Sequence, residues 1–223
     1  MNHRWLPIVI GMMWVSIGVF NRGEAMAKVQ SKGALVKKLE TGQSIIIAED
    51  KSLPICYVYA VIRRGYISDP PQHEGLTGLM GSMLMRGTTN RTREQIQDEL
   101  DQLGAELDVD VEAESLAIVG QTLQRNLAPF LDIFADVILH PTFPEDELEK
   151  EKRESISDLK QMRENDRALV RRFYKRALFQ THPYGIDADG KEATIARMTR
   201  KAVMAHYQKL FVDQNVFFAA SGD

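Results

Sequence analysis

The clearest hydrophobic pattern in the chain lies in residues 75–88. Five apolar side chains there follow the spacing i, i+3, i+4, i+7 and i+8, which is typical of a helix that packs one face against a core. They are Leu76, Leu79, Met80, Met83 and Leu84. Gly78, Gly81 and Ser82 share another face of the same helix. A glycine inside a helix costs about 1 kcal/mol relative to alanine, so two glycines one turn apart indicate that this face has a special requirement.

Strands are predicted on both sides of this helix, from β-branched, aromatic and alternating residues. They comprise residues 34–39, 44–48, 55–63, 105–111, 116–123 and 216–220. The first two flank a turn around Gly42 and predict a hairpin. In the strand at 105–111, the acids Glu106, Asp108 and Asp110 alternate with apolar residues. These acids would protect an exposed sheet edge from aggregation.

Further amphipathic helices are predicted from their apolar spacing and their end signals. They comprise residues 92–104, 126–140, 142–166, 168–179 and 199–210. Thr92 with Gln95 forms the pattern of a capping box, and Thr142 with Glu145 is a second candidate. The segment up to residue 166 is rich in mixed charge, which is typical of a solvated face. The helix at 168–179 is expected to pack through Leu169, Phe173, Ala177 and Leu178.

Residues 1–27 have the pattern of a secretory signal peptide. Arg4 supplies a positive charge, an apolar stretch covers residues 6–20, and Ala25-Met26-Ala27 is a small-x-small cleavage site. The apolar stretch is short for a membrane span, so we expect cleavage after Ala27 and export to the periplasm or the exterior, with no stable membrane span in the mature protein. An uncleaved N-terminal anchor is the alternative. Residues 28–223 are then expected to form a single domain.

Composition and charge exclude several classes of function. The chain has 28 Lys+Arg and 31 Asp+Glu, a net charge of −3, so nothing indicates nucleic acid or an anionic membrane surface as a partner. Its single cysteine, Cys56, cannot form an internal disulfide and is expected to be a small buried apolar residue. His140 and His206 are expected to be isolated, and no Ser/His/Asp or Cys/His catalytic group can be assembled from the sequence.

The segment Gly-Leu-x6-Met-Leu-x2-Gly-Thr, at residues 75–88, resembles the active-site helix of the pitrilysin/insulinase family of zinc peptidases. That family carries the motif His-x-x-Glu-His, in which two histidines bind zinc and the glutamate is the general base. The resemblance places the histidines at Gly78 and Ser82 and the base at Gly81. It places the third zinc ligand near Asp158 and a supporting glutamate at Glu151.

Those residue types cannot supply the chemistry of the family. Catalytic zinc needs three N, S or O ligands and an open position for water, whereas glycine has no side-chain donor and a serine hydroxyl is a poor substitute for imidazole. We therefore expect no catalytic or metal-binding residue and no cofactor here, and Glu151 and Asp158 are expected to be surface acids. A rearranged metal site that uses His73, Glu74 and Asp158 is an alternative.

The resemblance extends over residues 34–223 and includes His182-Pro183-Tyr184-Gly185. It implies an α+β fold: a mostly antiparallel sheet with helices on one side, one half-unit of a fold like that of pitrilysin or the mitochondrial processing peptidase. In the family, the strand that corresponds to residues 105–111 lies at the sheet edge, where substrate peptides can pair with it.

Family members enclose their substrate between two such half-units or between paired subunits. The leading hypothesis is therefore an exported, non-catalytic domain that pairs with a homologous subunit carrying an intact motif and helps to hold peptide substrate. The alternatives are an active zinc peptidase with a rearranged site, and a degenerate remnant without a partner. An exposed apolar face would favour pairing, whereas a fully polar surface would favour the remnant.

Overall fold

The structure of the protein is a computed structural model that describes residues 33–223. The predicted signal peptide, residues 1–27, and its cleavage site lie outside the described residues. Within the described part of the chain, no helix combines the length and the apolar character needed to cross a membrane.

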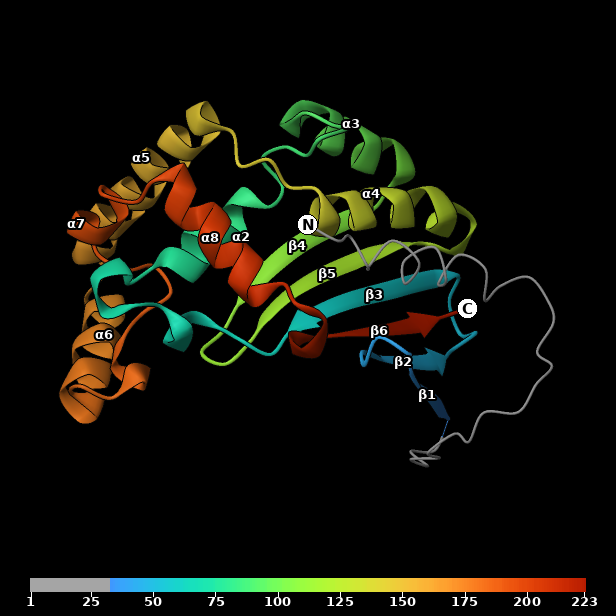
Figure 1. The fold of residues 1–223 in the computed structure, drawn as a ribbon, viewed down its shortest axis with the longest axis horizontal. Coiled ribbons are helices and arrows are strands. Elements are labelled where there is room, and N and C mark those ends of the chain that lie inside the picture. Colours follow the sequence, from blue (N-terminus) through green and yellow to red (C-terminus); the bar gives the residue numbers. More distant parts are fainter. Residues whose placement is uncertain (1–32) are drawn as a thin grey trace.

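A sheet of six strands forms the framework (Figure 1). The strands are β1 (Ala34–Lys38), β2 (Ser44–Glu49), β3 (Ile55–Ile62), β4 (Glu106–Val111), β5 (Leu116–Leu123) and β6 (Val216–Gly222). Their order across the sheet is β1-β2-β6-β3-β5-β4. Among these strands of residues 33–223, only the β2–β6 pair is parallel, so the prediction of a mostly antiparallel sheet is confirmed. The hairpin at β1–β2 and the edge position of β4 are confirmed as well.

One face of the sheet carries the core. In β3, Val58, Ala60 and Ile62 are buried, while the residues between them are only partly covered. Such alternation places every second side chain under the helices and leaves the other face more open. The helices are α2 (Leu76–Met83), α3 (Arg93–Leu103), α4 (Leu127–Leu139), α5 (Glu145–Gln161), α6 (Asp166–Phe179), α7 (Glu192–Ile195) and α8 (Arg200–Leu210). Cys56 is buried on the helix side, as expected.

Helix α2 packs against α5, α8 and β4. All five residues of its apolar stripe are buried, with at most 3% of their surface exposed, as the spacing predicted. A short 3-10 turn, Pro71–His73, precedes it. Asp69 accepts hydrogen bonds from the backbone N–H of Gly75 (2.9 Å) and of Thr77 (3.0 Å), and so satisfies donors at the start of the helix.

Two histidines that were expected to be isolated have partners. His206 on α8 lies 2.8 Å from the hydroxyl of Thr77, and His140 lies 3.1 Å from the carboxylate of Asp136. The Thr77–His206 pair joins two elements that are distant in the sequence, and the Asp136–His140 pair spans one helical turn at the end of α4. The spacing of the histidines along the sequence therefore did not predict their partners.

The predicted cap at Thr142 is wrong. Helix α5 begins after Pro144, which makes no side-chain cap, and the Thr142 hydroxyl instead donates to the carbonyl of Gly87 (3.1 Å). The capping box at Thr92 and Gln95 is confirmed. Thr142 does not cap α5 because the segment before this helix pairs with the chain after α2, through an isolated bridge between Thr88 and Pro141.

The predicted packing of α6 is also wrong. Phe173 and Leu178 were expected to point inward, but they are 66% and 57% exposed, and no residue of α6 is fully buried. The side of α6 that faces the molecule is ionic. It carries Arg172, Lys175 and Arg176, which form ion pairs described below.

Candidate functional site

The structure brings the positions of the family motif together in one hollow. A cavity of about 390 Å³ lies between α2, β4 and α5. Gly78 and Ser82 contribute its wall from α2, and Glu151 and Asp158 contribute from α5. Gly81 lies beside it, against β4. The correspondence that the resemblance implied therefore places these five positions around one site.

Gly78 is the point where another part of the chain closes onto α2. A Cβ added to Gly78 would lie 2.3 Å from the carbonyl oxygen of Ala188. Real Cβ atoms do not approach a backbone atom so closely, so the segment 186–190 would have to move to admit any side chain, including a histidine. The first histidine position is thus occupied by backbone.

Gly81 permits α2 to pack closely on β4. A Cβ at this position would lie 2.9 Å from a methyl of Val111 and 3.3 Å from a methyl of Val109. A glutamate there would point into the apolar floor of the hollow. Two different neighbours therefore account for the two glycines that the helix spacing singled out.

An ion network holds the segment 186–190 in place. Buried Glu74 accepts from Arg176 (2.8 Å) and Lys191 (2.5 Å), while Asp187 pairs with Lys175 (3.0 Å) and Arg172 (3.2 Å). Arg172 also donates to the carbonyl of Gly190. We call this set the Glu74–Asp187 network. It comprises Glu74, Arg172, Lys175, Arg176, Asp187 and Lys191.

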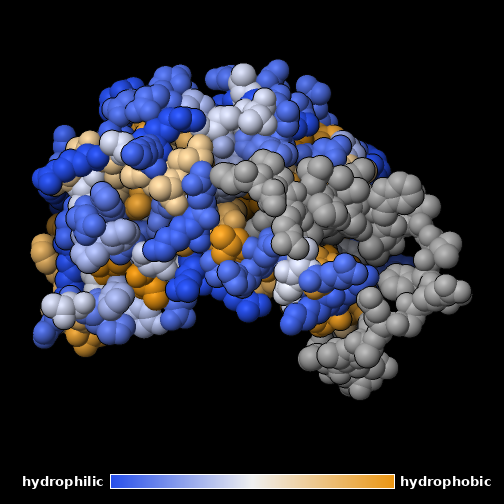
Figure 2. All heavy atoms as spheres, in the orientation of Figure 1, coloured by the Kyte–Doolittle hydropathy of each residue, from blue (hydrophilic) through white to orange (hydrophobic). Residues whose placement is uncertain are grey.

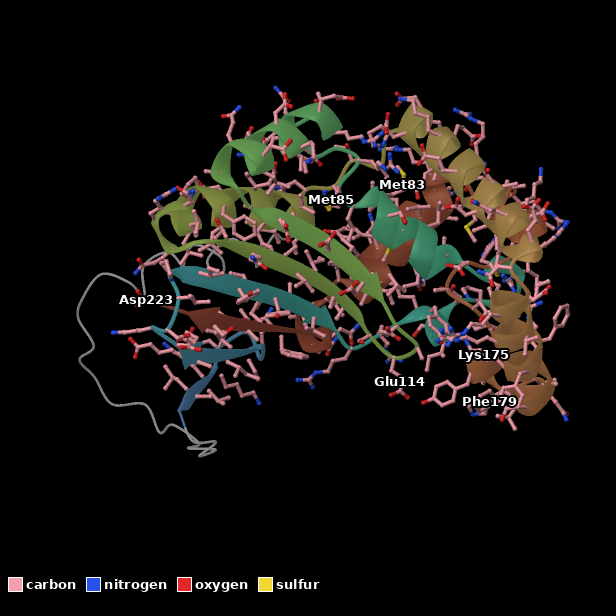
Figure 3. The ribbon with its side chains drawn as sticks, turned by 180° about the vertical axis from the view of Figure 1, so that it is seen from behind. Met83, Met85, Glu114, Lys175, Phe179 and Asp223 are labelled. Atoms are coloured by element: carbon pink, nitrogen blue, oxygen red, sulfur yellow. The ribbon has the colours of Figure 1, made fainter. Side chains whose placement is uncertain are left out.

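The cations of the network change the acidity of Glu74. Burial by itself would raise the pKa of the Glu74 carboxyl, but the hydrogen bond from Lys191 and the charge of Arg176 outweigh it and hold the pKa below its ordinary value. Glu74 is therefore ionised and engaged at both oxygens. Figure 3 labels Lys175, on the side of α6 nearer to the rest of the molecule.

The second histidine position holds no donor of the type that zinc prefers. Ser82 is exposed, and its hydroxyl donates to the carbonyl of Gly78 (3.3 Å), one turn earlier on the same helix. Such a bond ties the hydroxyl to its own helix. A neutral hydroxyl in this state is a weak ligand.

Glu151 was expected to lie at the surface, and this expectation is wrong. Its side chain is 9% exposed and forms an ion pair with Arg86 of the segment after α2. The same guanidinium also pairs with Glu154 (3.0 Å) and approaches Glu147 (3.8 Å). Because a buried carboxylate needs a partner, Glu151 links α5 to the end of α2. Asp158, by contrast, is exposed, as expected.

The residues present do not fit a catalytic zinc ion. Within residues 33–223, no three His, Cys, Asp or Glu side chains come together in a way that could hold a metal. His73, Glu74 and Asp158 in particular do not converge, and Glu74 is already engaged by two cations. The geometry gives no support to the rearranged site.

The edge strand β4 borders the same hollow. Val109 and Val111 line it, while Glu106, Asp108 and Asp110 are exposed on the opposite face of the strand. Within the described residues, β4 pairs only with β5, so its outer edge has main-chain groups available to an added strand. The hollow thus combines an apolar floor with an open strand edge.

The comparison with sequence families decides the relationship. The sequence model of the family described as Insulinase (Peptidase family M16) matches residues 44–189, which is well over half of the chain. The chain belongs to the M16 peptidase family. Its Gly78, Gly81 and Ser82 are therefore departures within an M16 domain.

Curated relatives of this M16 domain include proteins described as peptidases. It is 23% identical over 188 residues to an uncharacterized zinc protease of Rickettsia bellii, covering 84% of this chain and 46% of that protein. It is 22% identical over 184 residues to the beta subunit of the human mitochondrial-processing peptidase, covering 82% and 37%. The chain therefore spans less than half the length of these relatives.

Solved structures confirm the fold. A structure titled as a peptidase M16 inactive domain from Pseudomonas fluorescens has a TM-score of 0.82 and 24% identity, with 86% of this chain and 47% of that chain covered. The periplasmic protease PqqL of Escherichia coli has a TM-score of 0.80 and 15% identity, with 89% and 23% covered. The prediction of one half-unit of the M16 fold is confirmed.

Sequence reasoning missed two features of the site. The closure by Ala188 depends on a contact across 110 residues, and the Glu74–Asp187 network joins segments equally far apart. Two signals were present in the sequence: the glycines at 78 and 81, and the concentration of basic residues in 167–176.

Proposed function

We propose that this M16 domain is a non-catalytic, exported subunit that pairs with a homologous subunit carrying an intact His-x-x-Glu-His motif. In the pair it contributes surface that encloses or holds the peptide substrate. The observation that carries the non-catalytic role is the approach of the Ala188 carbonyl to Gly78, which leaves no room for a ligand at the first metal position.

The peptide-holding role is supported by what remains around the motif. The hollow of about 390 Å³ and the open edge of β4 persist beside the altered metal positions. A peptide could add to β4 by main-chain hydrogen bonds, which need no particular side chain and no metal. Pairing is supported by one of the relatives, which is named as the beta subunit of the mitochondrial-processing peptidase and is therefore one subunit of an enzyme.

The surface of the domain favours pairing over a degenerate remnant. Four large apolar side chains on α6 are more than half exposed. An exposed apolar face is the feature expected of a domain with a partner.

The direct test is metal analysis and peptidase assay of the purified mature protein, alone and with the candidate catalytic subunit. We expect substoichiometric zinc and no chelator-sensitive hydrolysis by the domain alone, and higher activity or altered KM for the pair. Stoichiometric zinc together with hydrolysis by the isolated domain would refute the proposal.

A further inference from the structure

Helix α6 presents an apolar stripe to solvent. Val170, Phe173, Tyr174 and Leu178 follow the spacing i, i+3, i+4 and i+8, so they lie on one face of the helix. Their exposed fractions are 66%, 66%, 66% and 57%. Hydrophobic surface is visible at the end of the molecule that carries α6 (Figure 2). We call these four residues the α6 stripe.

The orientation of the stripe is fixed by contacts on the other side of the helix. Arg172, Lys175 and Arg176 engage Asp187 and Glu74 on that side. Rotating α6 to bury the stripe would break these ion pairs and leave buried Glu74 without its cations.

The C-terminal end of α6 is anchored by aromatic packing. Phe179 packs edge-on against Tyr184, with ring centroids 5.7 Å apart. Tyr184 in turn donates to Glu114 (2.5 Å), in the turn between β4 and β5. Figure 3 labels Phe179 and Glu114 near this end of the helix. The stripe is therefore held outward at both the middle and the end of α6.

The charges beside the stripe indicate the chemistry of its occupant. Arg167 and Arg171 are exposed on the same side of the helix, and neither forms an ion pair within residues 33–223. Two free guanidinium groups beside an apolar centre complement a surface with an apolar centre and carboxylates at its rim.

We propose that the α6 stripe, flanked by Arg167 and Arg171, is the surface through which this domain binds its homologous M16 partner. The partner contributes an apolar patch bordered by Asp or Glu. This inference rests on the proposed function, because it assigns a surface to the pairing.

A protein partner agrees with the charge distribution better than a lipid surface does. A helix that lies on an anionic membrane carries its Lys and Arg residues on the polar face, where they remain available to the lipid headgroups. In α6, the cations Arg172, Lys175 and Arg176 turn inward to the Glu74–Asp187 network. The two aromatic rings and two arginines that remain outside are residue types enriched in protein interfaces, and Tyr and Arg are enriched at their energetic centres.

The test begins with the tagged full-length protein expressed in its own organism. The M16 protein with a complete His-x-x-Glu-His motif that copurifies is identified by mass spectrometry, produced separately, and titrated against purified variants. We expect the Val170→Glu/Phe173→Glu double variant to weaken binding by about 30-fold or more, the effect of losing interface hot spots. The Arg167→Glu/Arg171→Glu variant should weaken binding and reduce its salt dependence.

Leu53→Glu provides the matched control, because Leu53 is a 60% exposed apolar residue that lies outside α6. It should leave the affinity within about twofold. The stripe variants should melt near the wild-type temperature, because the changed side chains are solvated in the free domain. Tyr174→Ser serves as a milder second variant, with a smaller loss of affinity expected.

The outcomes separate this inference from the proposed function. Equal binding of all variants to the M16 partner would overturn the role of the stripe and leave pairing intact. Recovery of no M16 protein with the wild-type chain would overturn pairing itself. Self-association of the purified chain that the double variant abolishes would assign the stripe to a second copy. Stripe-dependent binding to vesicles of phosphatidylethanolamine and phosphatidylglycerol would assign it to a membrane.

Discussion

At the scale of single residues, the site is decided by the absence of side chains. Gly78 and Gly81 sit where backbone and valine methyl groups approach α2 more closely than a Cβ allows. The cost of glycine in a helix is offset by this packing. A ligand position that has become a close backbone contact cannot regain a histidine by a single substitution without displacing the segment 186–190.

Gly78→Ala is therefore expected to destabilise the domain, although alanine favours helix. The added Cβ meets the Ala188 carbonyl, and we expect a net loss of about 2 kcal/mol in the free energy of unfolding, typical of overpacking. Chemical denaturation measures it. Ser82→Ala, one turn away and exposed, should change stability by less than about 0.5 kcal/mol. Equal stability of Gly78→Ala and wild type would contradict the close contact.

Glu151 shows how a position of the family motif can acquire a different role. The side chain that supports the metal site in active relatives, according to the resemblance, here neutralises Arg86. Glu151 lines the hollow, but its correspondence to a position of the family did not indicate its burial. The guanidinium that pairs with it lies 65 residues away, and only the packing of α5 on α2 brings the two together.

At the scale of elements, α6 and the segment 186–190 are held together by the same set of ion pairs. The Glu74–Asp187 network ties both to the start of α2, and it explains why α6 needs no buried apolar residue. Loss of the network should therefore loosen the closure over Gly78 as well as the helix.

Glu74→Gln is expected to lower stability by about 2 kcal/mol near neutral pH, intermediate between exposed and fully buried ion pairs because the cations are partly solvated. The pKa of Glu74 is lower in the folded than in the unfolded protein. The contribution of Glu74 to the free energy of unfolding is then complete above the ordinary pKa of a glutamate. It is lost as the pH falls from that pKa toward the lower pKa of Glu74 in the folded protein.

Urea denaturation of wild type and Glu74→Gln at about pH 6 and at about pH 3 checks whether the stability contribution of Glu74 falls on acidification. The stability difference between the two proteins should shrink at the lower pH. A difference that grows on acidification would show that Glu74 is protonated in the folded state.

At the scale of the whole molecule, the chain holds one M16 half-unit and spans less than half of its curated relatives. The hollow, with the open edge of β4 beside it, and the α6 stripe occupy different parts of that half-unit. The two proposals place substrate contact and partner contact on separate surfaces, so variants of one surface can be tested without changing the other.

Export predicts a simple spectroscopic property of the mature protein. Both tryptophans of the chain, Trp5 and Trp14, lie in the expected signal peptide. Cleavage after Ala27 would remove them, so protein purified from the exported fraction should show tyrosine fluorescence but no tryptophan emission. N-terminal sequencing identifies the cleavage position. Tryptophan emission from that fraction would indicate an uncleaved anchor.

The sequence by itself determined most of the elements and the family. The α2 stripe, the β1–β2 hairpin, the edge strand β4 and the Thr92 cap follow from local spacing and local hydrogen bonds, which are written in neighbouring residues. The loss of the zinc ligands could also be predicted, because it depends only on residue identity at aligned positions.

Only the tertiary structure decided why those positions are empty and which surface remains free. The closure of Ala188 on Gly78, the burial of Glu151 and the outward turn of Phe173 all depend on partners far away in the sequence. An amphipathic pattern shows that a helix has an apolar face, but the charges on its other face can bind more strongly to the molecule. In α6 the ion pairs face the molecule, and the apolar face is exposed to solvent.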